Sequence, residues 1–103
     1  GYGENEFITI STSKEFNELD VLNGYVATER LDLYKRNSRV KDIEIIDSDN
    51  NIKYSFTLTD EVRFQNLKMS QGTKNVKLVI KSVYKGDKWD DTCITSIIPK
   101  LAY

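Results

Sequence analysis

The segment 84–92, YKGDKWDDT, combines residue types that can bind a polar ligand. It contains the only tryptophan of the chain, Trp89, followed by the carboxylates of Asp90 and Asp91. An aromatic ring can stack on the apolar CH face of a sugar, and carboxylates accept hydrogen bonds from its hydroxyl groups. Because the segment lies between two apolar runs, we expect a loop, where binding residues are often found. The structural alternative is that Trp89 closes the end of the core and one aspartate caps a turn.

A second group of candidate contacts lies in the long segment 23–39. Asn37 and Arg39 stand at its end, directly before an apolar run, and Tyr25 stands near its start. A guanidinium group can bind a carboxylate or a pair of neighbouring hydroxyls through two parallel hydrogen bonds. The alternative for Arg39 is an internal salt bridge to Asp90 or Asp91 that holds the two loops together. The candidate ligand contacts are therefore Tyr25, Asn37, Arg39, Tyr84, Trp89 and Asp90, with Asp91 as a candidate metal ligand.

The chain lacks the residues that several classes of function require. The chain has no histidine, which is the commonest general base and metal ligand, and its single cysteine, Cys93, forms neither an intrachain disulfide nor a thiolate zinc site. We expect Cys93 to be a small core residue that opens a strand, and we expect no catalysis. With 15 basic and 16 acidic residues, the chain lacks the excess of basic residues that a nucleic-acid-binding protein usually carries. We therefore expect no nucleic-acid partner. It has no apolar stretch long enough for membrane insertion.

The elements that must position these residues are strands. Apolar side chains alternate with polar ones most clearly over 52–58, the pattern of a half-buried strand. Expected strands cover 7–10, 19–22, 40–46, 52–58, 62–69, 76–83 and 93–98. We also expect a bulge at Gln65–Asn66, one helical turn at most within 11–19, and an end to the last strand at Pro99. About seven short strands in 103 residues predict one all-β domain, an antiparallel β-sandwich.

The direction of the strands predicts two different ends. If successive strands reverse direction, the connections 23–39, 59–61 and 84–92 lie at one end, together with Gly1–Glu6. The connections 11–18, 47–51 and 70–75 lie at the other. The turn that begins at Asp47 resembles a calcium loop in its oxygen side chains, but Ile52 stands where such a loop needs glycine. We therefore expect a hairpin turn there.

Three motifs together resemble a known family. They are Asn23-Gly24-Tyr25, Asn37-Ser38-Arg39-Val40-Lys41, and SVYKGDKWDDTCITSI from Ser82 to Ile97. Their order and spacing resemble the NADase-type glycan-binding domain, which is similar to discoidin and F5/8 type C modules of the galactose-binding jelly-roll fold. The resemblance covers most of the chain from Gly3 onward. It implies a jelly roll that binds carbohydrate or another surface component, and it implies no cleavage of NAD.

The chain departs from the family pattern at two places. Gly1-Tyr2-Gly3-Glu4 resembles the tail of a glycine-rich segment that follows the family's first strand, so we expect a fragment of a longer protein that lacks this strand. Related jelly rolls hold a structural calcium between the preceding loop and an acidic residue near the last strand. This chain has Ser96 where the family often has glutamate. The calcium site is therefore in doubt.

These observations predict a non-catalytic carbohydrate-binding or surface-attachment module. The resemblance implies that it acts outside a bacterial cell, in the periplasm or in the outer cell envelope, on a glycan or a cell-surface component. The alternative is a protein–protein interaction or assembly domain, in which the loops or an exposed strand edge bind a neighbour or form a homodimer. A third hypothesis is a small hydrolase that uses the acidic loop residues, but no paired carboxylates with an obvious cleft support it.

Overall fold

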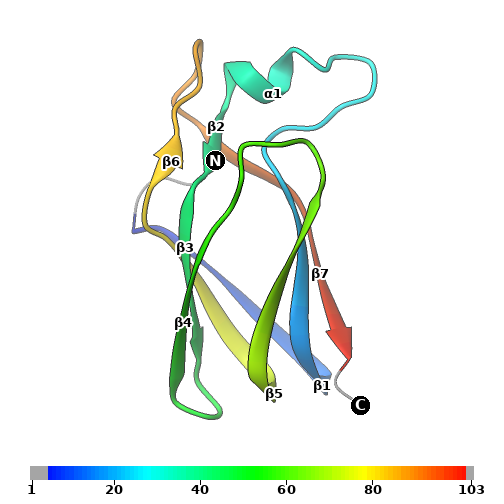
Figure 1. Cartoon of the computed structure of the whole chain (residues 1–103), viewed down its shortest axis with the longest axis vertical. Coiled ribbons are helices and arrows are strands. Elements are labelled where there is room, and N and C mark those ends of the chain that lie inside the picture. Colours follow the sequence, from blue (N-terminus) through cyan, green and yellow to red (C-terminus); the bar gives the residue numbers. More distant parts are fainter. Residues whose placement is uncertain (1–4, 102–103) are drawn as a thin grey trace.

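The computed structural model describes residues 5–101, and Gly1–Glu4 lie outside the described residues. The chain forms a seven-stranded sheet in the order β4-β3-β5-β1-β7-β2-β6 (Figure 1). The elements are β1 (Phe7–Asn23), α1 (Leu33–Arg36), β2 (Ser38–Val40), β3 (Asp42–Asp47), β4 (Ile52–Thr57), β5 (Phe64–Ile80), β6 (Val83–Tyr84) and β7 (Thr92–Leu101). Neighbouring strands are antiparallel except for the short parallel pair β2–β7. The predicted all-β class is confirmed, with this parallel pair as a departure. Within the described residues, no helix is long and apolar enough to cross a membrane.

Two long strands, β1 and β5, bend sharply at one end of the molecule (Figure 1). Residues 11–18 and 70–75 were expected to be connections, yet both stretches lie inside these continuous strands. β1 pairs with β5 on both sides of the bend, and the register shifts between Ser11 and Phe16. The predicted helical turn within 11–19 is wrong, because neighbouring strands supply the hydrogen bonds that a helix would make internally.

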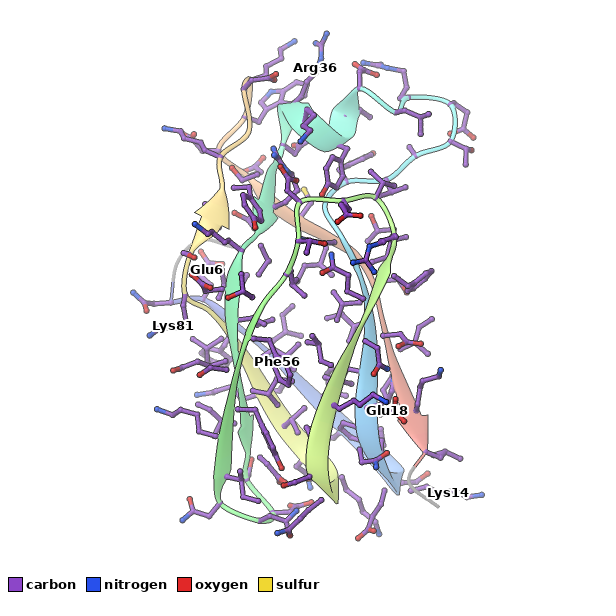
Figure 2. The ribbon with its side chains drawn as sticks, viewed as in Figure 1. Glu6, Lys14, Glu18, Arg36, Phe56 and Lys81 are labelled. Carbon is purple, nitrogen blue, oxygen red and sulfur yellow. The ribbon has the colours of Figure 1, made fainter. Side chains whose placement is uncertain are left out.

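The two bends curl the sheet so that its halves face one another. Apolar side chains from both halves meet in one buried cluster between them (Figure 2). Its members are Phe16, Leu19, Val21, Val40, Ile43, Ile45, Leu58, Leu67, Met69, Val76, Leu78 and Ile80. The alternation seen in the sequence therefore separates a core face from a solvent face, and the predicted β-sandwich is confirmed.

Two details of the predicted strands are wrong. The expected bulge at Gln65–Asn66 does not form, since Gln65 pairs with Val21 and Asn66 with Asp20 in regular register. Gln65 points to the core side, where its amide donates to the Thr59 carbonyl at 2.9 Å and accepts from the Thr59 N–H at 2.8 Å. A polar residue fits this buried position because its side-chain amide bonds to the N–H and carbonyl of Thr59, as the backbone of a neighbouring strand would.

The ends of two strands also differ from the prediction. The expected strand 40–46 is interrupted at Lys41, so that β2 and β3 are separate. Pro99 lies within β7 and pairs with Leu19 of β1, rather than ending the strand. At this point β7 has no strand on its other side among the described residues, so its missing N–H can face solvent.

The two ends of the sandwich differ as predicted (Figure 1). Residues 24–37, 58–63 and 85–91 lie together at one end, here called the loop pole. The β3–β4 hairpin and the two bends lie at the other end. There Thr73 donates to Asp47 at 2.7 Å and Asn50 donates to the Gly72 carbonyl at 2.9 Å. The predicted hairpin turn after Asp47 is confirmed.

Candidate functional site

A buried ion pair lies at the centre of the loop pole. Arg39, on β2, is only 4% exposed. Its Nη2 lies 2.7 Å from Oδ2 of Asp60, and its Nε lies 3.1 Å from Oδ1, so the guanidinium and the carboxylate make two parallel hydrogen bonds. The predicted salt bridge from Arg39 to Asp90 or Asp91 is wrong. Asp60 lies in the loop after β4, directly over Arg39, whereas the Asp90 side chain is 89% exposed and pairs with Lys85 at 3.9 Å.

Asp60 accepts two further hydrogen bonds from side chains of α1. The Tyr34 hydroxyl donates to Oδ1 at 2.8 Å, and Lys35 Nζ donates to Oδ2 at 2.9 Å. Hydrogen bonding from Arg39, with smaller contributions from Lys35 and Tyr34, holds the pKa of the Asp60 carboxyl well below its ordinary value despite partial burial. Burial and the bond to Asp60 raise the pKa of the Tyr34 hydroxyl well above its ordinary value. The carboxylate is therefore fixed in its charged form and already has several partners.

Arg39 also joins the loops through its remaining nitrogen. Nη1 donates to the carbonyls of Asn37 at 3.1 Å and Lys85 at 3.4 Å. The Arg39 guanidinium carbon lies 5.2 Å from the centre of the Tyr34 ring and 6.0 Å from that of Tyr84, within the range of cation–π attraction. Segments 24–37, 58–63 and 85–91 are thus held by one side chain.

Asn37 and Tyr84 also use their polar groups inside the protein. The Asn37 amide donates to the Leu33 carbonyl at 2.9 Å, at the end of α1, and Asn37 is 7% exposed. The Tyr84 hydroxyl donates to the Leu58 carbonyl at 2.8 Å. Three of the six predicted ligand contacts therefore use their polar groups inside the protein. Asn37 bonds within its own segment, and Arg39 and Tyr84 bond to the segment 58–63.

The Asn23-Gly24 motif attaches β1 to the pole. The buried Asn23 side chain donates to the Val40 carbonyl at 2.7 Å and accepts from the Val40 N–H at 3.0 Å, replacing a strand partner. Gly24 has a φ of +80°, and a Cβ there would lie 2.5 Å from a carbon of the Tyr34 ring. Thr95, from β7, donates to the Gly24 carbonyl at 2.6 Å. The motif is needed for close packing beneath the loops.

The other candidates are exposed on this frame. Trp89 is 37% exposed and Tyr25 is 45% exposed. The Trp89 N–H donates to the Arg36 carbonyl at 2.8 Å, so the backbone of its loop is bound to α1. Lys88 Nζ lies 4.6 Å from the centre of the Trp89 ring. Figure 2 shows Arg36 at the loop pole and Lys14 at the opposite end. The pole therefore presents Trp89, Tyr25 and Asp90 to solvent.

Asp91 and Cys93 lie where segment 85–91 leads into β7. The Asp91 carbonyl accepts a hydrogen bond from the Ser38 N–H at 2.9 Å, and the residue is exposed. Within residues 5–101, no group of three or more acidic or cysteine side chains is arranged to hold a metal ion. Cys93 is the second residue of β7 and is half-buried, and burial raises the pKa of its thiol.

Sequence reasoning missed Asp60, and it singled out Asn23 in a family motif without predicting its contact with Val40. Asp60 stands in the connection 59–61, which was correctly placed at the same end as Arg39. The available signal was a short acidic connection, with Asp60 and Glu61 adjacent, at that end.

Comparison with known proteins identifies the family. The model of the NAD glycohydrolase translocation F5/8 type C domain matches residues 1–99. No curated protein and no solved structure gives a significant match. The predicted resemblance to NADase-type, discoidin-like domains is confirmed. Because the match covers nearly the whole chain, the chain belongs to the family of NAD glycohydrolase translocation F5/8 type C domains.

Proposed function

We propose that the domain is a non-catalytic carbohydrate-binding or surface-attachment module whose ligand binds at the loop pole. The observation that carries the proposal is Trp89, an exposed aromatic side chain on a loop whose backbone is bonded to α1. Its ring can stack on a sugar, while Asp90 accepts hydrogen bonds from hydroxyl groups. Tyr25 offers a second exposed ring at the same pole.

The frame beneath these side chains favours binding. The Arg39–Asp60 pair joins the three segments of the pole before any ligand arrives. A ligand that binds there need not order the loops, so less of the interaction energy is lost to conformational entropy.

We place this activity outside a bacterial cell, in the periplasm or in the outer cell envelope, with a glycan or another cell-surface component as partner. A nucleic-acid partner is not proposed, because the formal net charge of the chain is −1. No reaction is assigned to the domain, since the carboxylate with the most strongly shifted pKa, Asp60, is bound within the frame.

Isothermal titration with galactosides and bacterial wall sugars, chosen from a glycan array, tests the proposal. Trp89→Ala should weaken binding at least about fivefold, because stacking on an aromatic ring contributes roughly 1 kcal/mol beyond its area. The control is Leu101→Ala, which removes an exposed apolar side chain, 43% exposed, from the end of β7 opposite the loop pole. If Trp89→Ala binds a ligand as tightly as wild type does, the proposed site is wrong.

The second candidate function is protein–protein interaction or assembly. The family description associates such domains with the translocation of an NAD glycohydrolase, a role that contact with another protein could serve. β4 lies at one end of the strand order and pairs only with β3 among the described strands. An exposed edge of this kind can accept a strand from a partner or form a homodimer. Size-exclusion chromatography with light scattering tests this: a stable dimer supports it, and a monomer at all concentrations excludes the homodimer.

A further inference from the structure

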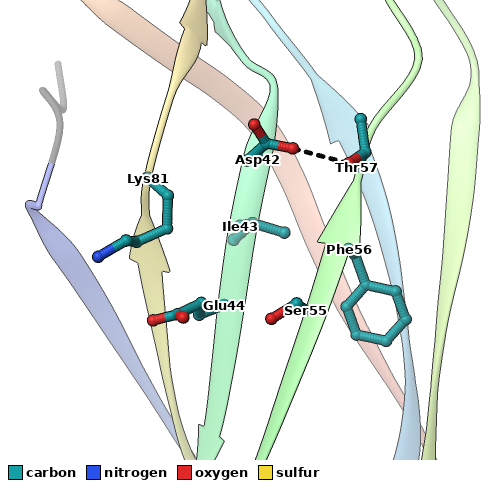
Figure 3. Close-up of a pocket in the computed structure, with 7 residues that line it drawn as sticks. All are labelled: Asp42, Ile43, Glu44, Ser55, Phe56, Thr57 and Lys81. Atoms are coloured by element: carbon teal, nitrogen blue, oxygen red, sulfur yellow. Dashed lines mark hydrogen bonds between the residues drawn. The ribbon is translucent and has the colours of Figure 1, made fainter.

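A hollow of about 330 Å³ lies on the side of the sandwich, over β3 and β4 (Figure 3). Its polar lining consists of Asp42, Glu44, Ser55, Thr57 and Lys81. Figure 2 shows Lys81 well below Arg36, so the hollow is separate from the top of the loop pole. Its volume falls at the lower end of the range for small-molecule sites, about 300–1,000 Å³.

Strand register places the polar lining on the solvent face. Glu44 pairs with Ser55 and Asp42 pairs with Thr57 across β3 and β4, so the members of each pair lie on the same face. Ile43, between the two acids, is 1% exposed and points into the core. The acids and hydroxyls therefore surround the hollow from outside the core.

Some of these groups already have partners. Asp42 accepts from the Thr57 hydroxyl at 2.7 Å and from the Ser82 hydroxyl at 2.6 Å. These bonds fix its side chain at one wall of the hollow and leave it little capacity for a ligand.

The other groups are much less engaged. In the described part of the chain, the ion pair of Glu44 is with Lys53 at 4.0 Å, the limit for such a pair, and the contact of Lys81 Nζ with Asn5 is long, at 3.4 Å. Among residues 5–101, no hydrogen bond is found for the Ser55 hydroxyl. The hollow thus offers an acceptor at Glu44, a donor at Lys81, and a hydroxyl that can act as either.

We propose that this hollow is a second ligand site of the domain, which takes a neutral sugar unit. The sugar class rests on the function proposed for the loop pole. An anion would face the carboxylates of Glu44 and Asp42, and a cation would face the ammonium group of Lys81. A neutral ligand with several hydroxyls matches the lining, because each hydroxyl can donate to Glu44 or accept from Lys81.

An exposed ring extends the same face. Glu44 pairs with Val79, and Val79 pairs with Phe7 on the next strand, so these three side chains form one row across the sheet. Phe7 is 53% exposed, and Lys77 Nζ lies 4.1 Å from its ring centre. An oligosaccharide lying across the strands would contact the hollow and then Val79 and Phe7.

NMR titration of backbone amides tests the site directly. The probes are lactose and diacetylchitobiose as neutral sugars, with a heparin disaccharide as an anionic control. The neutral sugars should shift the amides of Glu44, Ser55 and Lys81 in wild type and equally in Trp89→Ala. Glu44→Ala and Lys81→Met should each raise the Kd at the hollow about tenfold, because each removes a charge-assisted hydrogen bond. The matched control Lys74→Met, an exposed lysine in the bend of β5, should stay within about twofold, and thermal melts check that each variant folds.

Mapping by residue separates this proposal from the first one. Shifts confined to the loop pole would overturn the second site and support the first. Shifts confined to the hollow would support the second site and overturn the site at the loop pole. No shifts at either place would overturn both, and a response of the hollow to the heparin disaccharide but not to neutral sugars would overturn the ligand class.

Discussion

Replacement of Asp60 by asparagine would test whether the buried ion pair holds the loop pole together. Asparagine keeps the shape of the side chain and one oxygen for the Tyr34 hydroxyl, but it removes the charge that faces Arg39. Arg39 is 4% exposed, so water cannot take the place of the lost carboxylate. The variant leaves a buried guanidinium without its counter-charge, which strongly favours unfolding.

The size of the effect follows from the burial of the two partners. Removal of one member of a buried pair costs about 3–5 kcal/mol. The Asp60 side chain is 24% exposed, and backbone carbonyls still accept from Nη1 of Arg39, so we expect the lower end, about 3 kcal/mol. A small domain has a total stability of about 5–15 kcal/mol, so the loss would be a large fraction of it.

Urea unfolding, followed by circular dichroism and Trp89 fluorescence, measures this loss. With a slope of about 1.5 kcal/mol per molar urea, the midpoint should fall by about 2 M at neutral pH. The pKa of Asp60 is lowered in the folded state, so its stabilisation is complete above the ordinary aspartate pKa of about 3.9 and diminishes as the pH falls below it. The difference between wild type and D60N should therefore shrink in acid.

The matched control is Asp32→Asn at the same pole. The Asp32 side chain is 40% exposed and pairs with Arg30 at 3.0 Å and Arg36 at 3.1 Å. Because these partners are exposed, its loss should cost less than about 1 kcal/mol. Equal urea midpoints for the two variants, or a D60N effect that does not depend on pH, would refute a stabilising role for the buried pair.

Two further predictions concern the packing around Tyr34. Gly24→Ala should lower the free energy of unfolding by roughly 2–3 kcal/mol in urea, because φ is +80° and the new Cβ would overlap the Tyr34 ring; a loss below about 0.5 kcal/mol would contradict this. The Tyr34 hydroxyl should stay protonated above the ordinary tyrosine pKa of about 10, so ultraviolet titration of folded wild type and Tyr34→Phe should show the same number of ionising tyrosines up to about pH 11.

The sequence predicted those parts of the fold that depend on local alternation. The run 52–58 shows half-buried periodicity, and β4 forms there as Ile52–Thr57. The two ends of the sandwich were also predicted, because the direction of strands depends only on their order. The bends in β1 and β5 were not predicted, since residues 11–18 and 70–75 become strand only when each chain supplies hydrogen bonds to the other.

The location of the candidate site was predicted, but the contacts within it were not. The alternative to a ligand contact was a salt bridge from Arg39 to an acid of segment 85–91, and Arg39 instead binds Asp60 of segment 58–63. Asp60 and the acids of segment 85–91 all lie at the loop pole. The direction of their side chains decides which of them binds Arg39. Asn23 and Gln65 were also missed as structural residues, because each replaces a backbone partner that lies far away in the sequence.

The buried pair also determines how binding experiments on this pole must be interpreted. Arg39 has the residue type of a ligand contact, yet its donors are bound to Asp60 and to backbone carbonyls. A variant of Arg39 that loses ligand would therefore report the collapse of the loops as readily as the loss of a contact. Trp89 projects from a backbone that is bonded to α1, and the Asp90 side chain is 89% exposed, so neither side chain supplies the hydrogen bonds of the frame. Only loss of binding at these exposed positions, with the urea midpoint unchanged, would identify a direct contact.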